Sequence, residues 1–483
     1  MLVTVWSRFA GSCRPPGCVR LTRFASVVLA AVSIWCAVPV LAQDLDYMVY
    51  TESPRLFLRE RRLRLLKRER ERQSMRWVQF ESLIAGKARM AEPGFSYALY
   101  GIVSGEAEPC KAAADWAVQT ANANNPDDLR QIALVADWCQ TSLGEAQSAQ
   151  INRKLTPSLS TRPKSPQAIR SAALAAFAVA DSEPKAAAAF LQYAIEDWWR
   201  KQIQPQLRDG KNPFERKADL MAAVEFLHAV RDNLRADLRE GSVKWFENLA
   251  PLLVLSYYPA PWPSAENEYR IPMYEGSGGP SLKEAALGRA SELALVAFDT
   301  NAQAHQFLQG WLIQDRFLMR GPFGITHELL WANPYLPGLS YTYMPDQAHM
   351  GGMLLARSSW DEDATWFGYM SGRAQVFRNG SRMQMKLDGK VAPLTLGATR
   401  IHFGASGLRF ETGWLKTTLD DERPSKEEYA YVVGLEPNKL YDIEVDDEEL
   451  TEARTDSGGI LSLTFAVGRK AGVRIKPAAP LPN

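Results

Sequence analysis

The residue types that can move protons gather in two long stretches of this chain. The first spans residues 257–279, where four prolines exclude a helix, and the second spans residues 320–347. Tyrosine and histidine can act as acid and base, while asparagine and arginine can neutralise a carboxylate next to the proton that is removed. Long ordered loops often carry binding or catalytic groups, so we expect these side chains to form a site. The candidate acid–base residues are Tyr269, His327, Tyr341 and Tyr343, and the candidate ligand-binding residues are Asn267, Arg270, Arg320, Trp331 and Asn333.

Further arginines add positive charge near these stretches. Arg316 lies in the helix predicted for residues 302–319 and Arg320 directly follows it; standing four residues apart, they fall on one helical face. There they could bind an acidic ligand or pair with neighbouring carboxylates. Arg373 and Arg378 lie in a predicted strand that could face the same ligand.

Ordinary packing competes with each of these roles. Tyr341 and Tyr343 alternate as in a strand, and we favour packing at a domain junction over catalysis for this pair. His327 precedes Glu328, but the HExxH spacing of a zinc protease is absent. His228 and His305 lie on predicted helices and are interpreted as structural.

A set of carboxylates offers a different chemistry. Glu266, Glu268 and Glu275 in the first stretch could supply the acid and base of a glycosidase. The sequence has no Gly-rich phosphate loop, nucleophile-elbow serine or Cys-x-x-Cys pair. We therefore predict no cofactor and no metal, and we disfavour nucleotide enzymes, α/β-hydrolases and thiol oxidoreductases.

Residues 1–42 have the pattern of a cleavable signal peptide. They contain four arginines and no acidic residue, with an apolar run from Ser26 to Val38 and small residues before a cleavage point after Ala42. No later stretch reaches the ~20 apolar residues that a transmembrane helix needs. We expect an exported protein, periplasmic or extracellular, with no transmembrane span after cleavage and an oligomeric state that the sequence does not predict.

Cleavage of this leader would change both the charge and the cysteine content. The net charge would fall from +1 to −3, because four arginines and no acids are removed. A chain of this charge is not expected to bind nucleic acid. Two of the five cysteines, Cys110 and Cys139, would remain. An oxidising compartment permits a disulfide between them, and two buried thiols are an equally good interpretation.

Helical periodicity dominates residues 43–345. In residues 215–239, for example, Leu220, Val224 and Leu227 recur at steps of three and four, which forms one apolar stripe. The charged stretch 59–86 predicts one amphipathic helix. Short links between such segments favour antiparallel helical hairpins, which we expect to form an incomplete α/α ring.

Residues 346–483 have the pattern of an antiparallel β domain. Short segments of alternating polarity are separated by turn signals such as Asn379-Gly380 and Pro437-Asn438. The last segments look like the final strands of an extracellular β-sandwich. The sequence therefore predicts a multidomain fold, in which helical hairpins are followed by an antiparallel β-sandwich.

Three features together resemble the heparinase II/III-like and alginate-lyase-like polysaccharide lyases. They are the segment PRLFL at residues 54–58, the Trp-rich helical region, and RSSWDEDATWFGY at residues 357–369. In those families an incomplete α/α toroid is followed by a β-sandwich. The resemblance implies β-elimination from a uronate-containing polysaccharide, in which a base removes the C5 proton and the C6 carboxylate is neutralised.

One departure from those families bears on activity. Residues 371–389, SGRAQVFRNGSRMQMKLDG, contain no histidine, whereas the lyases carry a histidine that faces the cleft in this segment. Two hypotheses therefore stand. The chain is an exported lyase for an acidic polysaccharide, or it is a non-catalytic polysaccharide-binding or cell-envelope scaffold protein.

Overall fold

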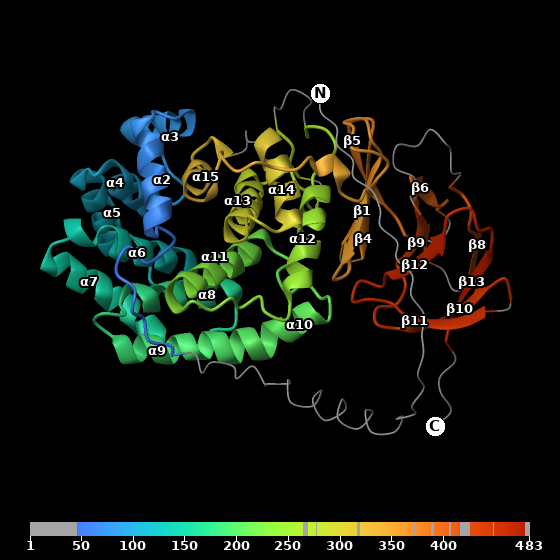
Figure 1. Ribbon diagram of the computed structural model, residues 1–483, viewed down its shortest axis with the longest axis horizontal. Helices are drawn as coiled ribbons and strands as arrows, with labels where there is room; N and C mark the ends of the chain where they lie inside the picture. The colour runs from blue at the N-terminus through green and yellow to red at the C-terminus, as the bar shows by residue number, and fades with distance from the viewer. Residues whose placement is uncertain are drawn as a thin grey trace, which may run out of the picture. The chain divides into compact units, whose positions relative to one another are not determined.

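The computed structural model has helices in its N-terminal part and strands in its C-terminal part (Figure 1). This order confirms the sequence-based prediction of a helical region followed by antiparallel strands. The leader predicted at residues 1–42 lies outside the described residues, as do Asn267, Arg316, Glu266 and Glu268. The structure describes residues 46–263, 269–276, 278–315, 319–370, 372–387, 391–404, 407–415, 426–447 and 449–478.

The helical part consists mainly of short α-helices joined by short links. Their bounds are α2 Glu60–Glu71, α3 Met75–Ala85, α4 Pro93–Ser104, α5 Ala107–Gln119, α6 Pro126–Trp138, α7 Glu145–Leu155, α8 Pro166–Ala178, α9 Pro184–Gln192, α10 Gln204–Arg208, α11 Lys217–Leu234, α12 Val243–Leu255, α13 Leu282–Phe298, α14 Gln303–Gln314 and α15 Ile325–Trp331.

Helix α6 illustrates why these segments form helices where they do. The Asn125 side chain accepts hydrogen bonds from the backbone N–H groups of Asp127 and Asp128, and Pro126 occupies the first helical position. Both features satisfy or remove the unpaired donors at a helix start. The stripe predicted on α11 is confirmed, because Leu220, Val224 and Leu227 are all buried.

A subset of the helices forms a closed series of contacts. Helix α4 packs against α6, α6 against α8, α8 against α11, and α11 against α13. Helix α15 contacts both α13 and α4, so the last member of the series meets the first. Helices α5, α7 and α9 pack beside α4, α6 and α8. The series therefore surrounds a common interior, into which side chains of six helices can point.

Three local predictions were wrong. The stretch 59–86 forms two helices, because the chain breaks at Gln73, whose φ is 50°. The stretch 320–347 is not a continuous loop, because it contains α15. Tyr341 and Tyr343 belong to a short 3₁₀ turn and not to a strand, so they do not alternate across a sheet.

The strands form three sheets. The first, β1-β2-β3-β4-β5, is antiparallel throughout; the second is β12-β9-β7-β6, with β7 and β9 parallel; the third is β11-β10-β13-β8. The predicted turn at Asn379-Gly380 joins β4 to β5, and both residues have the positive φ of a tight hairpin. The bounds are β1 Gln347–Met350, β2 Met353–Arg357, β3 Trp366–Met370, β4 Arg373–Arg378, β5 Ser381–Met385, β6 Leu394–Leu396, β7 Thr399–Phe403, β8 Leu408–Glu411, β9 Glu427–Val433, β10 Leu440–Val445, β11 Glu449–Arg454, β12 Leu461–Ala466 and β13 Gly472–Pro477.

The three sheets are stacked in layers (Figure 1). Leu354 and Phe367 of the first sheet share a core with Val433 of the second. On the opposite face of the second sheet, Val432 packs with Ile443 and the rest of the third sheet. Successive residues of β9 therefore serve different cores, as the alternation of a strand requires. The middle sheet is covered on both sides, so the strands form three layers, and the predicted β-sandwich is not confirmed in detail.

The first sheet also packs against the helices. The Trp366 indole N–H donates to the carbonyl of Leu255 at the end of α12, over 2.7 Å. Tyr258 stacks on Phe377 with ring centroids 5.2 Å apart. These buried aromatic contacts fix the first sheet to the segment that follows α12.

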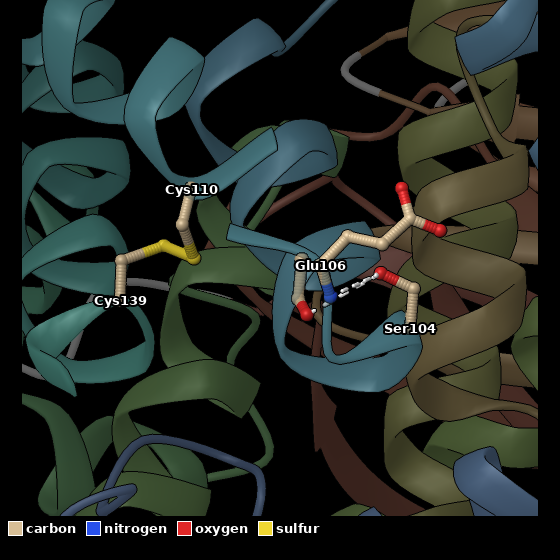
Figure 2. The surroundings of a disulfide bond; sticks show 5 residues. Ser104, Glu106, Cys110 and Cys139 are labelled. Atoms are coloured by element: carbon tan, nitrogen blue, oxygen red, sulfur yellow. Dashed lines mark hydrogen bonds between the residues drawn. A yellow bond between two sulfur atoms is a disulfide. The ribbon is translucent and has the colours of Figure 1, made fainter. Parts of the chain in front are cut away.

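A disulfide joins Cys110 on α5 to Cys139 after α6 (Figure 2). Its sulfur atoms are buried, and the neighbouring turn is held by a hydrogen bond from the Glu106 N–H to the Ser104 hydroxyl. Of the two interpretations that the sequence left open, the disulfide is the one found. Every helix in the described part of the chain is too short or too polar to span a membrane.

Loss of this disulfide is expected to lower the free energy of unfolding by about 3 kcal/mol, since it closes a loop with a sequence separation of 29 residues. Urea unfolding of the wild type with and without a reductant measures the effect. The double variant Cys110→Ala/Cys139→Ala is the control, because its unfolding should not respond to the reductant. Equal curves for oxidised and reduced wild type would contradict the expectation.

Candidate functional site

A polar cavity of about 190 Å³ lies within the closed series of helices. Every member of the series contributes to its wall or flanks it, from Glu92 at the start of α4 to His327 on α15. Because the helices converge here, residues that are far apart in the sequence meet. The charged and polar members of the wall are Glu92, Asn125, Asp127, Asp128, Arg130, Gln131, Arg170, Lys283 and His327.

Behind this wall, a buried charge network links four helices. Glu225 on α11 is fully buried and accepts hydrogen bonds from Arg130 on α6 at 2.8 Å and from Arg170 on α8 at 3.1 Å. Arg130 also donates to Glu92 at 2.9 Å, and Arg170 donates to Asp127 at 3.2 Å. The two guanidinium groups are therefore used inside the protein, while the Asp127 carboxylate remains 58% exposed in the cavity.

The electrostatics of the network keep its carboxylates ionised. Burial alone would raise the pKa of Glu92, but the Arg130 guanidinium and His327 outweigh it and hold that pKa well below its usual range. The same balance lowers the pKa of Glu225, where Arg130 and Arg170 outweigh burial. The exposed carboxylate of this network, Asp127, can accept a hydrogen bond from a ligand hydroxyl.

His327 is the one predicted acid–base residue that lines this cavity. Its Nε2 lies 2.7 Å from a Glu92 carboxylate oxygen. Its Nδ1 is buried and has no hydrogen-bond partner among the described residues. The ring packs edge-on against Phe95, with centroids 5.0 Å apart. In this arrangement both nitrogens are turned away from solvent, so the ring orients Glu92 more directly than it meets a ligand.

A larger cavity of about 510 Å³ continues from the first. Asp127, Ala218, Lys283 and Leu287 line both cavities, so the two adjoin, and we call them together the inner groove. The larger part adds amides, carboxylates and the aromatic ring of Tyr274, and it reaches Met353 and Met370 of the first sheet. Its volume is in the range of ligand-binding clefts.

Two of the other predicted residues share a second region. Arg270 lies over the Trp311 ring at 5.7 Å and pairs with Glu362, and its N–H donates to Asp315. Tyr341 packs against Trp311 and Trp360, with centroids 5.2 and 5.3 Å away. The structure thus brings Arg270 and Tyr341 to the same aromatic cluster, apart from the wall that contains His327.

The remaining predicted residues lie in other parts of the structure. Trp331 is buried against Phe57 and His228, and the side-chain oxygen of Asn333 accepts from the Tyr335 N–H. Tyr343 and Arg320 are exposed and Tyr269 is half-buried. At the strand ends, Arg373 pairs with Glu275, and Arg378 is exposed.

In the segment that lacks the lyase histidine, the Gln375 side chain is held by hydrogen bonds to the stretch 257–279. Gln375 on β4 is 1% exposed. Its oxygen accepts from the Tyr258 hydroxyl and its nitrogen donates to the Tyr274 carbonyl, both at 2.9 Å. Arg382 on β5 donates to the same carbonyl. These side chains hold the loop after Tyr257 onto the sheet, so the sheet offers no free base at this point.

Sequence reasoning missed most of the cavity wall. Glu92, Arg130 and Arg170 of the wall and Glu225 behind it were not singled out, although Glu225 interrupts the apolar run LMAAVEFLHAV. A charge in such a run needs a buried partner. That signal could have identified the network, but it could not have paired its members.

A second buried network lies outside the groove. Glu292 on α13 is 0% exposed and accepts from the Tyr257 hydroxyl at 2.8 Å. Arg289 lies over the rings of Tyr257 and Trp311 and donates to the Asp315 carbonyl. Burial raises the pKa of Glu292 to about 7. Within the described residues no group of side chains has the make-up of a metal site.

The raised pKa of Glu292 predicts that the protein loses stability as the pH rises towards 7. The folded state holds this proton more tightly than the unfolded state, whose pKa is about 4.5, so the stabilisation is complete below pH 4.5 and is lost as the pH rises to about 7. The loss should be about 3 kcal/mol. Urea unfolding at pH 5 and pH 8 should show it in the wild type and a smaller change in Glu292→Gln. An equal change in both proteins would contradict this assignment.

No protein-family model matches this sequence, and no curated protein matches it. Among solved structures, a chain titled "Glycoside hydrolase" aligns at 8% identity with a TM-score of 0.32, over 80% of this chain and 71% of its own. This likeness carries no argument about activity. The resemblance to polysaccharide lyases therefore stays a sequence-based prediction.

Proposed function

We propose that this chain is an exported carbohydrate-binding protein, which holds a glycan in the inner groove and does not cleave it. The proposal joins the lyase-like sequence segments with the geometry of the groove. In it, the closed helical series corresponds to the toroid of the lyases, and the stacked sheets correspond to their β-sandwich.

The composition of the inner groove supports sugar binding. Carboxylates and amides such as Asp127, Asn212 and Gln167 can accept and donate hydrogen bonds with sugar hydroxyls. Tyr274, Phe214 and the methionines provide apolar surface for the faces of the rings. The groove is built on helices that are joined by buried ion pairs, an arrangement that favours a pre-formed site.

The observation that carries the non-catalytic assignment is the state of Gln375. Gln375 stands in the segment where the lyases that this sequence resembles carry a histidine. It is buried, and both its amide oxygen and its amide nitrogen form hydrogen bonds. Elimination needs an accessible base and an acid besides a group that neutralises the carboxylate. Tyr341 is packed between two indoles, and both nitrogens of His327 are enclosed, so neither of these two predicted acid–base residues is placed to take over the role of that histidine.

Binding and turnover should be measured on the same polymers. Alginate and heparan sulfate are the polymers of choice, because both contain uronates. The proposal expects that calorimetry detects binding while ultraviolet absorbance, which reports the unsaturated product of elimination, stays flat. Absence of binding to every polymer tested would overturn it.

A second candidate function is β-elimination itself, and the His327–Glu92 pair favours it. An imidazole held by a carboxylate can accept a proton, and Lys283, which is exposed in both parts of the groove, could neutralise a uronate. Rising absorbance that is lost in His327→Gln but kept in His305→Gln would establish this function. His305 is also buried, but it bonds to the Asp299 carbonyl outside the groove.

A further inference from the structure

A third large cavity lies between the helices and the strands. Its volume is about 910 Å³, and its walls come from residues 207–211 and 241–248 on one side and from residues 349–351 and 454–457 on the other. We call it the seam cavity. It is separate from the inner groove, because the two share no lining residue.

The seam cavity has an excess of positive charge. Its exposed cations are Arg208, Lys211, Lys244 and Arg454, against two acids, Asp209 and Asp456. Lys244 stands in the first turn of α12, a helix end that itself favours anions. The four cations outnumber the two acids, so the wall keeps a net positive charge.

Both acids of the seam cavity are already engaged within the protein. Asp456 accepts from His349 at 2.9 Å and from the backbone N–H groups of Gly352, Gly458 and Ile460. Burial opposes its charge, but these hydrogen bonds, His349 first, lower its pKa. Asp209 is within 3.5 Å of Lys211. Arg208 and Arg454 each donate one hydrogen bond to a backbone carbonyl, of Gly241 and Asn438, which leaves their positive charge at the cavity wall together with that of Lys244.

The inner groove differs in this respect. Its smaller part has three acids, Glu92, Asp127 and Asp128, and three bases, Arg130, Arg170 and Lys283, of which both arginines are buried. A polyanion therefore gains little long-range attraction there. The seam cavity provides that attraction at a neighbouring point.

The two sites adjoin through one close backbone contact. Gly351 lines the seam cavity and Asn212 lines the inner groove. A Cβ atom built on Gly351 would lie 2.6 Å from the Asn212 nitrogen, so the two residues touch. The seam cavity and the inner groove therefore lie on the two sides of this contact and are close neighbours.

We propose that the seam cavity binds the carboxylates of an acidic polysaccharide whose neighbouring units occupy the inner groove. This inference rests on the proposed function and specifies its ligand class. Lysine and arginine bind such carboxylates through charge-assisted hydrogen bonds. The anionic chain would thus be captured in the seam cavity, while its hydroxyl groups are recognised in the groove.

Charge reversal at Lys244 tests the inference with a matched control. Lys244 is exposed at the second position of α12, and Lys185 is exposed at the second position of α9, outside all three cavities. Glutamate suits both positions, so Lys244→Glu and Lys185→Glu should fold equally well. Lys244→Glu should bind alginate about tenfold more weakly with a shallower salt dependence, whereas Lys185→Glu should bind like the wild type. Arg454→Glu should repeat the loss.

The binding results separate failure of the seam-cavity inference from failure of the proposed function. A uronate disaccharide, which is short enough for the groove alone, should bind wild type and Lys244→Glu alike. If alginate binds wild type, Lys244→Glu and Arg454→Glu equally, the seam-cavity inference is overturned and the proposed function stands. If the wild type binds neither alginate nor the disaccharide, the proposed function fails first. Tighter binding of the neutral polymer dextran or of duplex DNA than of alginate would also overturn the inference.

Discussion

Replacing Ala218 by tryptophan is expected to weaken glycan binding roughly 100-fold, a loss of about 3 kcal/mol. Ala218 stands in the first turn of α11 and lines both parts of the inner groove. An indole at this position would fill the junction of the two parts, because Ala218 lines both of them. The affinity for alginate, measured by calorimetry, reports the change.

Ala188→Trp is the control for this substitution. Ala188 is also half-buried on a helix, α9, but it lines none of the three cavities. It should keep the affinity of the wild type while showing a similar change in thermal stability. Undiminished binding by Ala218→Trp would place the glycan outside the groove.

Replacing Glu225 by glutamine is expected to lower the free energy of unfolding by about 3 kcal/mol. Glu225 is the shared partner of Arg130 and Arg170, and both guanidinium groups are almost fully buried. Removing its charge leaves each of the two buried cations with a single carboxylate, Glu92 for Arg130 and the exposed Asp127 for Arg170, which is a costly arrangement. Urea unfolding at pH 7 measures the loss, and Glu108→Gln is the control, because Glu108 forms only a surface pair with Lys111.

The pH dependence gives a second check on Glu225. Its pKa is lower in the folded protein, so its contribution is present above the unfolded value of about 4.5 and is lost as the pH falls below it. Wild-type stability should therefore drop on acidification, and the drop should be smaller in Glu225→Gln. This sign is opposite to that expected for Glu292, whose pKa is raised. Parallel acid-side curves for the two proteins would show that Glu225 does not carry the charge.

Local sequence patterns were enough to predict much of the fold. The stripe of α11, the proline-broken segment after Tyr257 and the Asn379-Gly380 hairpin depend on interactions within a few residues. The break at Gln73 and the third sheet were missed for the same reason. A left-handed residue inside a charged run has no strong local signal, and the number of layers depends on which face of β9 finds a partner.

The site was harder to predict because its members come from distant helices. His327 and Glu92 are 235 residues apart, and Arg130 and Glu225 are 95 apart. Nothing in a single sequence pairs such residues. Tyr341 and Trp331 were chosen for their chemistry, but the structure places their rings in packing contacts, which residue type alone does not distinguish from binding.

The most direct test of the central claim is the structure of this chain in complex with a uronate tetrasaccharide. We expect an intact saccharide along the inner groove, with one ring beside Ala218 and Lys283 and an acidic end directed towards Lys244. An empty groove with the saccharide bound elsewhere would contradict the binding site. A cleaved, unsaturated product in the groove would contradict the assignment of a non-catalytic protein.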